Sequence, residues 1–168
     1  RQRQTAFFSA TLGSEITSLA NSMLVDPVHI RINPKQPTVE KINQQAFFVN
    51  RDHKCDLLIS KLSEPEVKRV IVFTRMKYVA NRVCERLKRV GIKAAPIHGN
   101  RTQAARTKAL DGFRKGRVKV LVATDIAARG IDVDKISHVI NFDIPHEPQS
   151  YIHRIGRTAR AGLYGQAW

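Results

Sequence analysis

Short apolar runs alternate with longer amphipathic stretches along the chain. Two runs, at residues 69–73 and 118–123, consist mainly of β-branched and aliphatic residues, which is typical of strands buried on both faces of a sheet. Between them, Val79, Val83, Leu87 and Val90 recur at helical spacing before Gly91, which predicts a helix that ends at this glycine. Further strands are predicted at residues 5–8, 28–32, 44–49, 94–97 and 138–142, and further helices at 14–24, 52–62, 102–114 (with Thr102 as N-cap) and 148–155.

Strands that alternate with helices of this length imply right-handed crossovers and a parallel sheet, so we expect an α/β fold. Ligands of such sheets bind beyond the carboxyl ends of the strands. The residues just past Phe73, Ile97, Ala123 and Phe142 are therefore the positions at which a functional site is expected.

The regular alternation is interrupted near residues 33–41, where Pro34 and Pro37 indicate a linker. The composition also shifts at this point. We therefore predict a division between residues 1–33 and a main domain at residues 34–168. The segment at residues 165–168 is expected to open a final strand.

Positive charge is concentrated in one part of the chain. The 168 residues carry a formal net charge of +15, and residues 75–119 hold 14 Lys and Arg against 2 Asp and Glu. A basic zone of this kind attracts polyanions such as nucleic acid. Solvated helix faces with long basic side chains would give the same composition. Charge by itself leaves both readings open.

Several classes of protein are disfavoured by composition. No apolar run approaches the roughly 20 residues of a membrane-spanning helix, and no leader of the secretory kind opens the chain. Cys55 and Cys84 are the only cysteines, without a Cys-x-x-Cys pair or a Cys/His cluster. We therefore expect a cytoplasmic protein with two free thiols, no metal site of its own and no membrane partner.

The string His-Arg-Ile-Gly-Arg-Thr-Ala-Arg at residues 153–160 is the most specific motif. It places Arg154, Arg157 and Arg160 three residues apart, with Gly156 between two of them. Guanidinium groups match the geometry of phosphate oxygens, and glycine permits close approach of the backbone. A surface helix rich in arginine is the alternative reading of these three residues.

A second motif, at residues 123–132, directly follows a predicted buried strand. Thr124 offers a hydroxyl and a backbone N–H to a phosphate, and Asp132 could accept hydrogen bonds from ribose hydroxyls. An ordinary aspartate turn is the alternative for Asp132.

These motifs resemble, in order, those of DEAD-box RNA helicases of helicase superfamily two. The resemblance extends over nearly the whole chain and rests on the segments at residues 9–11 (Ser-Ala-Thr), 70–75, 98–101, 103–106, 123–132 and 153–160. The segment at residues 39–49 also resembles the bacterial RhlE-type subgroup. Ala159 departs from the family, most members of which carry glycine there; an alanine is acceptable unless its φ is positive.

The resemblance implies a fold and a set of roles. The fold is a RecA-like three-layer α/β/α domain with a mostly parallel sheet, the C-terminal one of two helicase domains. Arg157 and Arg160 are implied as arginine fingers on the γ-phosphate of ATP. The other implied roles are ATP binding for Asp132, Arg129 and Gly130, contact between domains for His153, Ser9 and Thr11, and RNA binding for Thr124, Gly99, Arg106, Arg75, Arg101 and Gln103, with Gln103 bracing Arg106.

Two motifs required for ATP hydrolysis are missing from the chain. It contains neither a G-x-x-x-x-G-K-S/T loop to hold the phosphates nor the sequence Asp-Glu-Ala-Asp. In the family both belong to the N-terminal RecA-like domain, of which residues 1–33 resemble the end. We therefore expect ATP and Mg²⁺ to be held mainly by that domain, and this chain by itself to be inactive as an ATPase and to bind RNA weakly.

Expected partners are RNA, gripped through its phosphates, and the N-terminal RecA-like domain, with ribosome assembly and RNA decay both compatible as settings. A DNA helicase or remodelling motor of the same superfamily is the competing reading.

Overall fold

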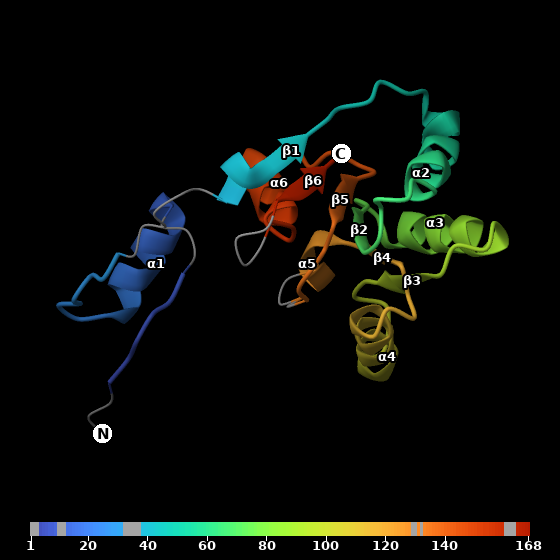
Figure 1. Ribbon diagram of the computed structural model, residues 1–168. Coiled ribbons are helices and arrows are strands. Elements are labelled where there is room, and N and C mark those ends of the chain that lie inside the picture. The colour runs from blue at the N-terminus through green and yellow to red at the C-terminus, as the bar shows by residue number, and fades with distance from the viewer. Residues whose placement is uncertain (1–3, 10–12, 32–37, 129–130, 132, 160–163) are drawn as a thin grey trace. The chain divides into compact units, whose positions relative to one another are not determined.

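The computed structural model describes residues 4–9, 13–31, 38–128, 131, 133–159 and 164–168 (Figure 1). The chain divides into two compact units, Arg1–Lys35 and Gln36–Trp168. The assignment of residues 1–33 to the end of a preceding domain stays a prediction.

The first unit contains one helix among its described residues, α1 (Ser14–Met23). Ala20 is buried, whereas Leu19 and Met23, which share its predicted apolar face, are about half exposed. The strands predicted at residues 5–8 and 28–32 are wrong for the described residues, which adopt no strand there. A strand requires a hydrogen-bonding neighbour, and an apolar alternating pattern cannot provide one.

The second unit is built on a sheet of six parallel strands in the order β1-β6-β5-β2-β4-β3. The central strands β2, β4 and β5 pair in register, with Val70 opposite both Val120 and His138. The strands are β1 (Ile42–Gln44), β2 (Val70–Phe73), β3 (Ala94–Ile97), β4 (Val120–Ala123), β5 (His138–Asn141) and β6 (Gly165–Ala167). The expected α/β fold is confirmed, with an entirely parallel sheet.

Helices cover both faces of this sheet. The helices α2 (Lys54–Leu62) and α3 (Lys77–Arg89) bury Leu58, Leu62, Val83 and Leu87 against one face. The helices α4 (Gln103–Arg114) and α5 (Asp125–Ala128) pack against the other face, where Phe113 is fully buried. In Figure 1, α2 and α3 lie beside one another, and α4 lies on the other side of strands β3 and β4. The remaining helices are α6 (Pro148–Ile155) and the short 3-10 helices η1 (Thr38–Lys41) and η2 (Arg51–His53).

Local signals placed several element ends correctly. Thr102 is the N-cap of α4, because its Oγ1 accepts a hydrogen bond from the Ala105 amide at 3.3 Å. Gly91 follows α3 with a φ of 81°, a left-handed conformation that glycine adopts without strain. The strand predicted at residues 44–49 is wrong: β1 ends at Gln44, and the next five residues have no regular structure. An apolar run continues there at residues 46–49, but the partner strand β6 pairs with residues 42–44.

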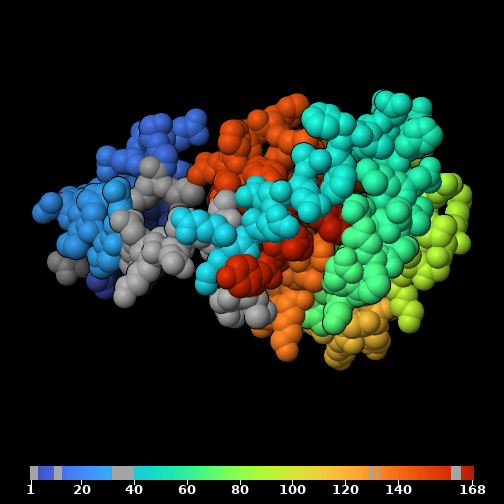
Figure 2. Space-filling model, turned by 45° about the horizontal axis from the view of Figure 1, so that its top comes forward, coloured from blue at the N-terminus to red at the C-terminus, as the bar shows by residue number. Residues whose placement is uncertain are grey.

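The C-terminal residues are integrated into the sheet. Gly165–Ala167 forms the predicted final strand between β1 and β5, and the Trp168 ring packs edge-on against Phe47 and beside His138. Figure 2 shows the red C-terminal residues lying between the cyan β1 region and the green segment that follows it. Strands β1 and β6, far apart in sequence, therefore close one end of the sheet.

The parallel arrangement gives the sheet two chemically distinct edges. We call the edge with the strands' carboxyl ends the site edge, and the edge with the turns from helix to strand the turn edge. Between β4 and β5 the chain crosses from one side of β2 to the other. Ligands of open parallel sheets bind at such a switch point, on the site edge.

Candidate functional site

Three central strands deliver polar residues to the same place on the site edge. Thr74 follows β2, Thr124 and Asp125 follow β4, and Asp143 lies two residues beyond β5. Backbone hydrogen bonds continue the ladder past the strand ends: the Thr74 amide donates to the Ala123 carbonyl at 2.9 Å, and the Asp143 amide donates to the Phe73 carbonyl at 3.2 Å. The site is therefore built on a rigid part of the fold.

Arg154 is the centre of this cluster. Its side chain is 3% exposed and makes a bidentate ion pair with Asp125, with Nε–Oδ1 and Nη2–Oδ2 distances of 2.6 and 2.8 Å. Nη1 donates to Asn141 Oδ1 at 3.1 Å and to the Asp143 carbonyl at 2.6 Å. The guanidinium also lies over the Phe73 ring, 5.1 Å from its centroid. The hydrogen bonds use four of the five N–H donors of the guanidinium.

This finding corrects the sequence interpretation of the three arginines. Arg154 shares their regular spacing, but it faces the protein interior and joins α6 to β4 and β5. It is a structural residue, not a phosphate ligand. Asp125 and Asp143 were not predicted from the sequence as residues of the site. A buried arginine needs a carboxylate partner, and Asp125 beside Thr124 was the available signal.

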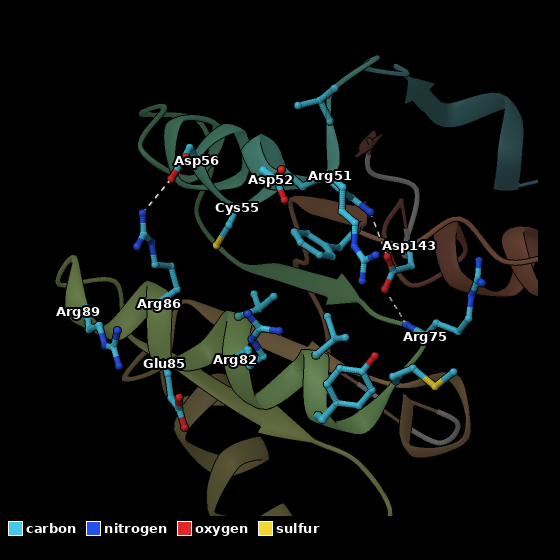
Figure 3. A pocket seen from close by; sticks show the side chains of 17 residues that line it. Arg51, Asp52, Cys55, Asp56, Arg75, Arg82, Glu85, Arg86, Arg89 and Asp143 are labelled. Atoms are coloured by element: carbon cyan, nitrogen blue, oxygen red, sulfur yellow. Dashed lines mark hydrogen bonds and ion pairs between the residues drawn. The ribbon is translucent and has the colours of Figure 1, made fainter.

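Asp143 links this cluster to α2 and β2. Its Oδ1 pairs with Lys54 Nζ at 3.0 Å, and its Oδ2 accepts the Arg75 amide at 3.0 Å. Figure 3 shows Asp143 between the start of α2 and Arg75, at one end of a groove between α2 and α3 with a volume of about 920 Å³. The exposed Arg75 side chain donates from Nη2 to the Ile144 carbonyl at 3.3 Å. Hydrogen bonds from its backbone and from its side chain thus both fix the position of Arg75.

Thr124 lies at the junction of β4 and α5 and is 8% exposed. Its amide donates to the Ile97 carbonyl at 3.2 Å, and its carbonyl accepts the amides of Ala127 and Ala128. The expectation that its backbone N–H is available to a phosphate is therefore wrong, because the sheet already uses this donor. The predicted phosphate contact of Thr124 then concerns its hydroxyl alone.

Arg157 lies beyond the end of α6 and is half-buried. Its Nη1 donates to the Ile131 carbonyl at 3.3 Å, which holds the guanidinium against the loop after α5. Asp132, the predicted ribose ligand, is the next residue along that loop. The structure thus brings Arg157 to the segment that carries the second motif.

The backbone after Arg157 is held tightly. The Thr158 hydroxyl is buried and donates to the Ile136 carbonyl. Ala159 has a φ of 54°, the case in which an alanine is strained relative to glycine. Its methyl group packs with Ile42, Ile155 and Ala167, and this burial offsets part of the strain.

The loop after β3 carries a second group of predicted residues. His98 is 2% exposed, and its Nε2 lies 3.0 Å from Asn81 Oδ1. Burial, together with Arg101 and Lys77, lowers the pKa of His98. The neutral ring then donates from Nε2, and Nδ1 has no hydrogen-bond partner in the described ranges of the chain. Gly99 follows on the surface, and the end of the Lys77 side chain lies close to it.

At the start of α4, two predicted residues touch one another. Arg106 Nη1 donates to Gln103 Oε1 at 3.3 Å, the bracing contact expected from the resemblance. The Arg106 Nε is buried and has no hydrogen-bond partner among the residues that the structure describes.

The remaining predicted site residues are placed as follows. His153 is exposed on α6, and Ser9 belongs to the first unit. Thr11, Arg129, Gly130, Asp132 and Arg160 lie outside the described residues.

Other chemistries find no support in the described part of the chain. It contains no group of His, Cys, Asp and Glu side chains placed to hold a metal ion. Burial raises the pKa of the Cys84 thiol to about 12 and also raises that of Cys55, so both remain protonated and are poor nucleophiles. In the same ranges, none of the helices has the length and apolarity needed to cross a bilayer.

Comparison with known proteins gives a consistent result. The family described as "Helicase conserved C-terminal domain" matches residues 52–162. The chain is 45% identical over 168 residues to the ATP-dependent RNA helicase SrmB of Haemophilus influenzae, covering 99% of this chain and 38% of that protein. It is 43% identical over 166 residues to the DEAD-box ATP-dependent RNA helicase CshA of Bacillus subtilis, covering 99% of this chain and 34% of that protein. The chain thus spans little more than a third of these curated relatives.

Solved structures share the fold. The Escherichia coli DEAD-box protein SrmB, bound to regulator of ribonuclease activity A, matches with a TM-score of 0.67 and 43% identity, over 75% of this chain and 72% of that one. Saccharomyces cerevisiae Dbp5 L327V, bound to RNA and ADP BeF3, matches with a TM-score of 0.81 and 31% identity, over 95% of this chain and 43% of that one. The chain therefore belongs to the helicase conserved C-terminal domain family, in the RecA-like form found in DEAD-box RNA helicases.

Proposed function

We propose that this chain is the C-terminal motor half of an ATP-dependent DEAD-box RNA helicase. The observation that carries the proposal is the position of Arg157. It projects from the end of α6 onto the loop after α5, at the switch point where α/β sheets bind their ligands. In this position a guanidinium can complete a nucleotide pocket whose other wall is a second domain.

Arg157 and Arg160 act as arginine fingers on the γ-phosphate. They stabilise the charge that develops as the phosphoryl group is transferred. Asp132, Arg129 and Gly130 contact the ribose side of ATP, while His153, Ser9 and Thr11 join the two domains. Arg154 positions this motif by fixing α6 to Asp125.

ATP and Mg²⁺ fit this arrangement only in part. Arg157 supplies cationic donors for a phosphate, but the described residues offer neither a phosphate cradle nor a carboxylate cluster for Mg²⁺. The N-terminal RecA-like domain must hold the metal and most of the nucleotide. The chain by itself therefore does not turn over ATP, and residues 1–33 are the end of that other domain.

RNA is held by its phosphates along the same edge. The candidate ligands are the Thr124 hydroxyl, the exposed loop at Gly99 and Arg101, the braced pair Gln103 and Arg106, and Arg75. Contacts to phosphates position RNA without reading its sequence. The hydrogen bond from Arg106 Nη1 to Gln103 Oε1 supports this assignment, because it holds the Arg106 guanidinium in place.

The cellular setting is a finer proposal. The segment at residues 39–49 favours an RhlE-type helicase acting in the cytoplasm. One relative, SrmB, has been solved with regulator of ribonuclease activity A, which favours RNA decay as the setting, with ribosome assembly as the alternative. The sequence of the whole protein, with a phosphate loop and Asp-Glu-Ala-Asp upstream, would test the class.

ATP turnover by the full-length protein tests the motor role. Arg157→Ala should lower RNA-stimulated hydrolysis by about 10³- to 10⁵-fold, the range for loss of an arginine finger. Arg82→Ala, which removes an exposed arginine on α3, is the matched control and should leave turnover unchanged. Near-normal hydrolysis by Arg157→Ala would contradict the role. Stimulation by DNA as strong as by RNA would favour the DNA motor instead.

A further inference from the structure

A concentrated group of cations lies away from the site edge. The two turns that connect α3 to β3 and α4 to β4, residues 88–93 and 114–119, contain seven Lys and Arg and no Asp or Glu. The turn from α2 to β2, residues 63–69, carries two basic and two acidic residues. The excess of positive charge is therefore confined to these two turns and does not extend over the whole turn edge.

These two turns are neighbours in space. Strands β3 and β4 are adjacent, and the Lys93 carbonyl accepts the amides of Lys119 and Val120 at 2.8 and 3.1 Å. The cations of both turns therefore form one surface. We call it the basic turn surface; it consists of Lys88, Arg89, Lys93, Arg114, Lys115, Arg117 and Lys119.

Only part of this charge has a structural task. Lys119 Nζ donates to the Leu62 carbonyl at 2.6 Å and caps the end of α2, and Arg114 lies 4.0 Å from Asp111. Cations also stabilise the last turn of a helix, which accounts for Lys88 and Arg89. This effect falls off beyond the helix end, so it does not explain Lys93 or Arg117.

Three cations remain available to a ligand. Lys93, Lys115 and Arg117 are exposed, and within the described ranges no carboxylate forms an ion pair with any of them. Like charges placed together without counterions repel one another, and binding of a polyanion would relieve this repulsion.

We propose that the basic turn surface is a second RNA-binding surface, which holds RNA flanking the segment on the site edge. The inference rests on the proposed function, because it takes RNA to be the ligand of the site edge. Phosphates suit this surface better than an acidic protein does. A protein interface needs a central apolar or aromatic anchor, and among these turns the exposed large apolar side chain is Val90.

The distance between the edges makes the proposal specific. Each central strand has four residues, which span about 13 Å at roughly 3.3 Å per residue. A short RNA that lies along the site edge leaves no free length for the basic turn surface, whereas a longer RNA extends to both. Contacts at the turn edge should contribute only to binding of the longer molecule.

Fluorescence anisotropy with this chain tests that dependence on length. The test variant is Lys93→Gln/Lys115→Gln/Arg117→Gln, and the control Arg51→Gln/Arg82→Gln/Lys108→Gln removes three exposed cations elsewhere. The test variant should bind a single strand of about 30 nucleotides at least tenfold more weakly at low salt, and its salt slope should fall by about 2, since each phosphate contact contributes roughly 0.7. Binding of about six nucleotides should not change beyond the control.

Three outcomes would overturn the proposal: equal loss in the control, equal loss for both RNA lengths, or no loss at all. Polyglutamate that binds the chain as tightly as RNA, and loses affinity in the test variant, would assign the surface to an acidic protein instead. Lysine acylation adds a local readout, because long RNA should protect Lys93 and Lys115 but not Lys108.

Arg106→Gln separates this inference from the proposed function. If that variant weakens both RNA lengths while the test variant does not, the site edge binds RNA and the inference fails. If only the test variant loses affinity, RNA binding by the site edge is contradicted, and the basic turn surface binds RNA by itself and not as a flanking surface.

Discussion

The two edges of the sheet use positive charge in opposite ways. On the site edge, Arg154 is 3% exposed and is occupied by Asp125, Asn141 and Asp143. On the turn edge, Lys93, Lys115 and Arg117 are exposed and form no ion pair within the described ranges. The arginine-rich motif thus contains Arg154, whose guanidinium is occupied within the protein. The two turns of the basic turn surface carry no recognised motif, yet they present cations that can bind a ligand.

This difference shows that the presence of a sequence motif and the concentration of positive charge indicate different roles for cationic residues. A buried guanidinium surrounded by acceptors fixes the backbone around a site, and its removal leaves a carboxylate without a partner. An exposed, unpaired lysine contributes little to folding and retains its full attraction for a phosphate. Perturbing one cation from each edge should therefore affect stability and binding differently.

Arg154→Ala should produce the largest effect. The Asp125 carboxylate is 43% exposed and can be solvated after the substitution, so the expected cost is that of lost charged hydrogen bonds, about 1.5–3 kcal/mol, together with the lost contacts to Asn141, Asp143 and Phe73. Urea unfolding of the chain measures this loss. Lys93→Ala, an exposed residue on the opposite edge, should change stability by less than about 0.5 kcal/mol. Equal stabilities for the two variants would remove the distinction between the edges.

Lys119→Gln tests a cation of the basic turn surface to which we assign a contact that stabilises the fold. This lysine donates to the Leu62 carbonyl at the end of α2, so its replacement should cost about 1 kcal/mol. Lys115→Gln, in the same turn and exposed, provides the comparison and should leave the urea midpoint unchanged. If Lys115→Gln destabilises the chain as much, the basic turn surface has a structural role that we have not identified.

The two buried histidines make stability depend on pH at both edges. His98 lies at the site edge and His138 at the turn edge, and burial lowers the pKa of each below its usual 6.5. The unfolded chain then takes up protons first, so stability should fall as pH decreases below about 6.5 and level off below the folded-state pKa values.

His98→Gln should reduce this dependence without abolishing it, because His138 still titrates. Urea midpoints at about pH 7.5 and 5.5 measure the difference. Identical pH dependence in the two proteins would show that His98 does not contribute.

Ala159→Gly should have the smallest effect. Glycine relieves a left-handed strain of about 1–2 kcal/mol but loses a buried methyl group worth about 0.8 kcal/mol and some backbone entropy. The net change should stay below about 0.5 kcal/mol. Ala109→Gly, at a buried position inside α4, lacks the relief and should cost about 2 kcal/mol. A comparable loss at both positions would argue against strain at Ala159.

Local patterns predicted the strands of the second unit well where burial was two-sided. Residues 70–73 and 120–123 are continuous apolar runs, and both lie in the fully buried centre of the sheet. Predictions failed where pairing decided the outcome. The apolar positions at residues 28–32 alternate like a strand, yet the described residues among them form none, and β1 ends at Gln44 although an apolar run continues at residues 46–49.

The sequence by itself determined the parallel α/β architecture, the order of the motifs and hence the family. These depend on periodicity and on short strings of residues, which are local properties of the chain. Only the tertiary structure decided that Arg154 turns inward while Arg157 lies against the loop after α5, because the partner of Arg154 is 29 residues away and meets it across the sheet edge. The gathering of cations from two separate turns into one surface likewise depends on β3 and β4 being neighbours, which no single segment specifies.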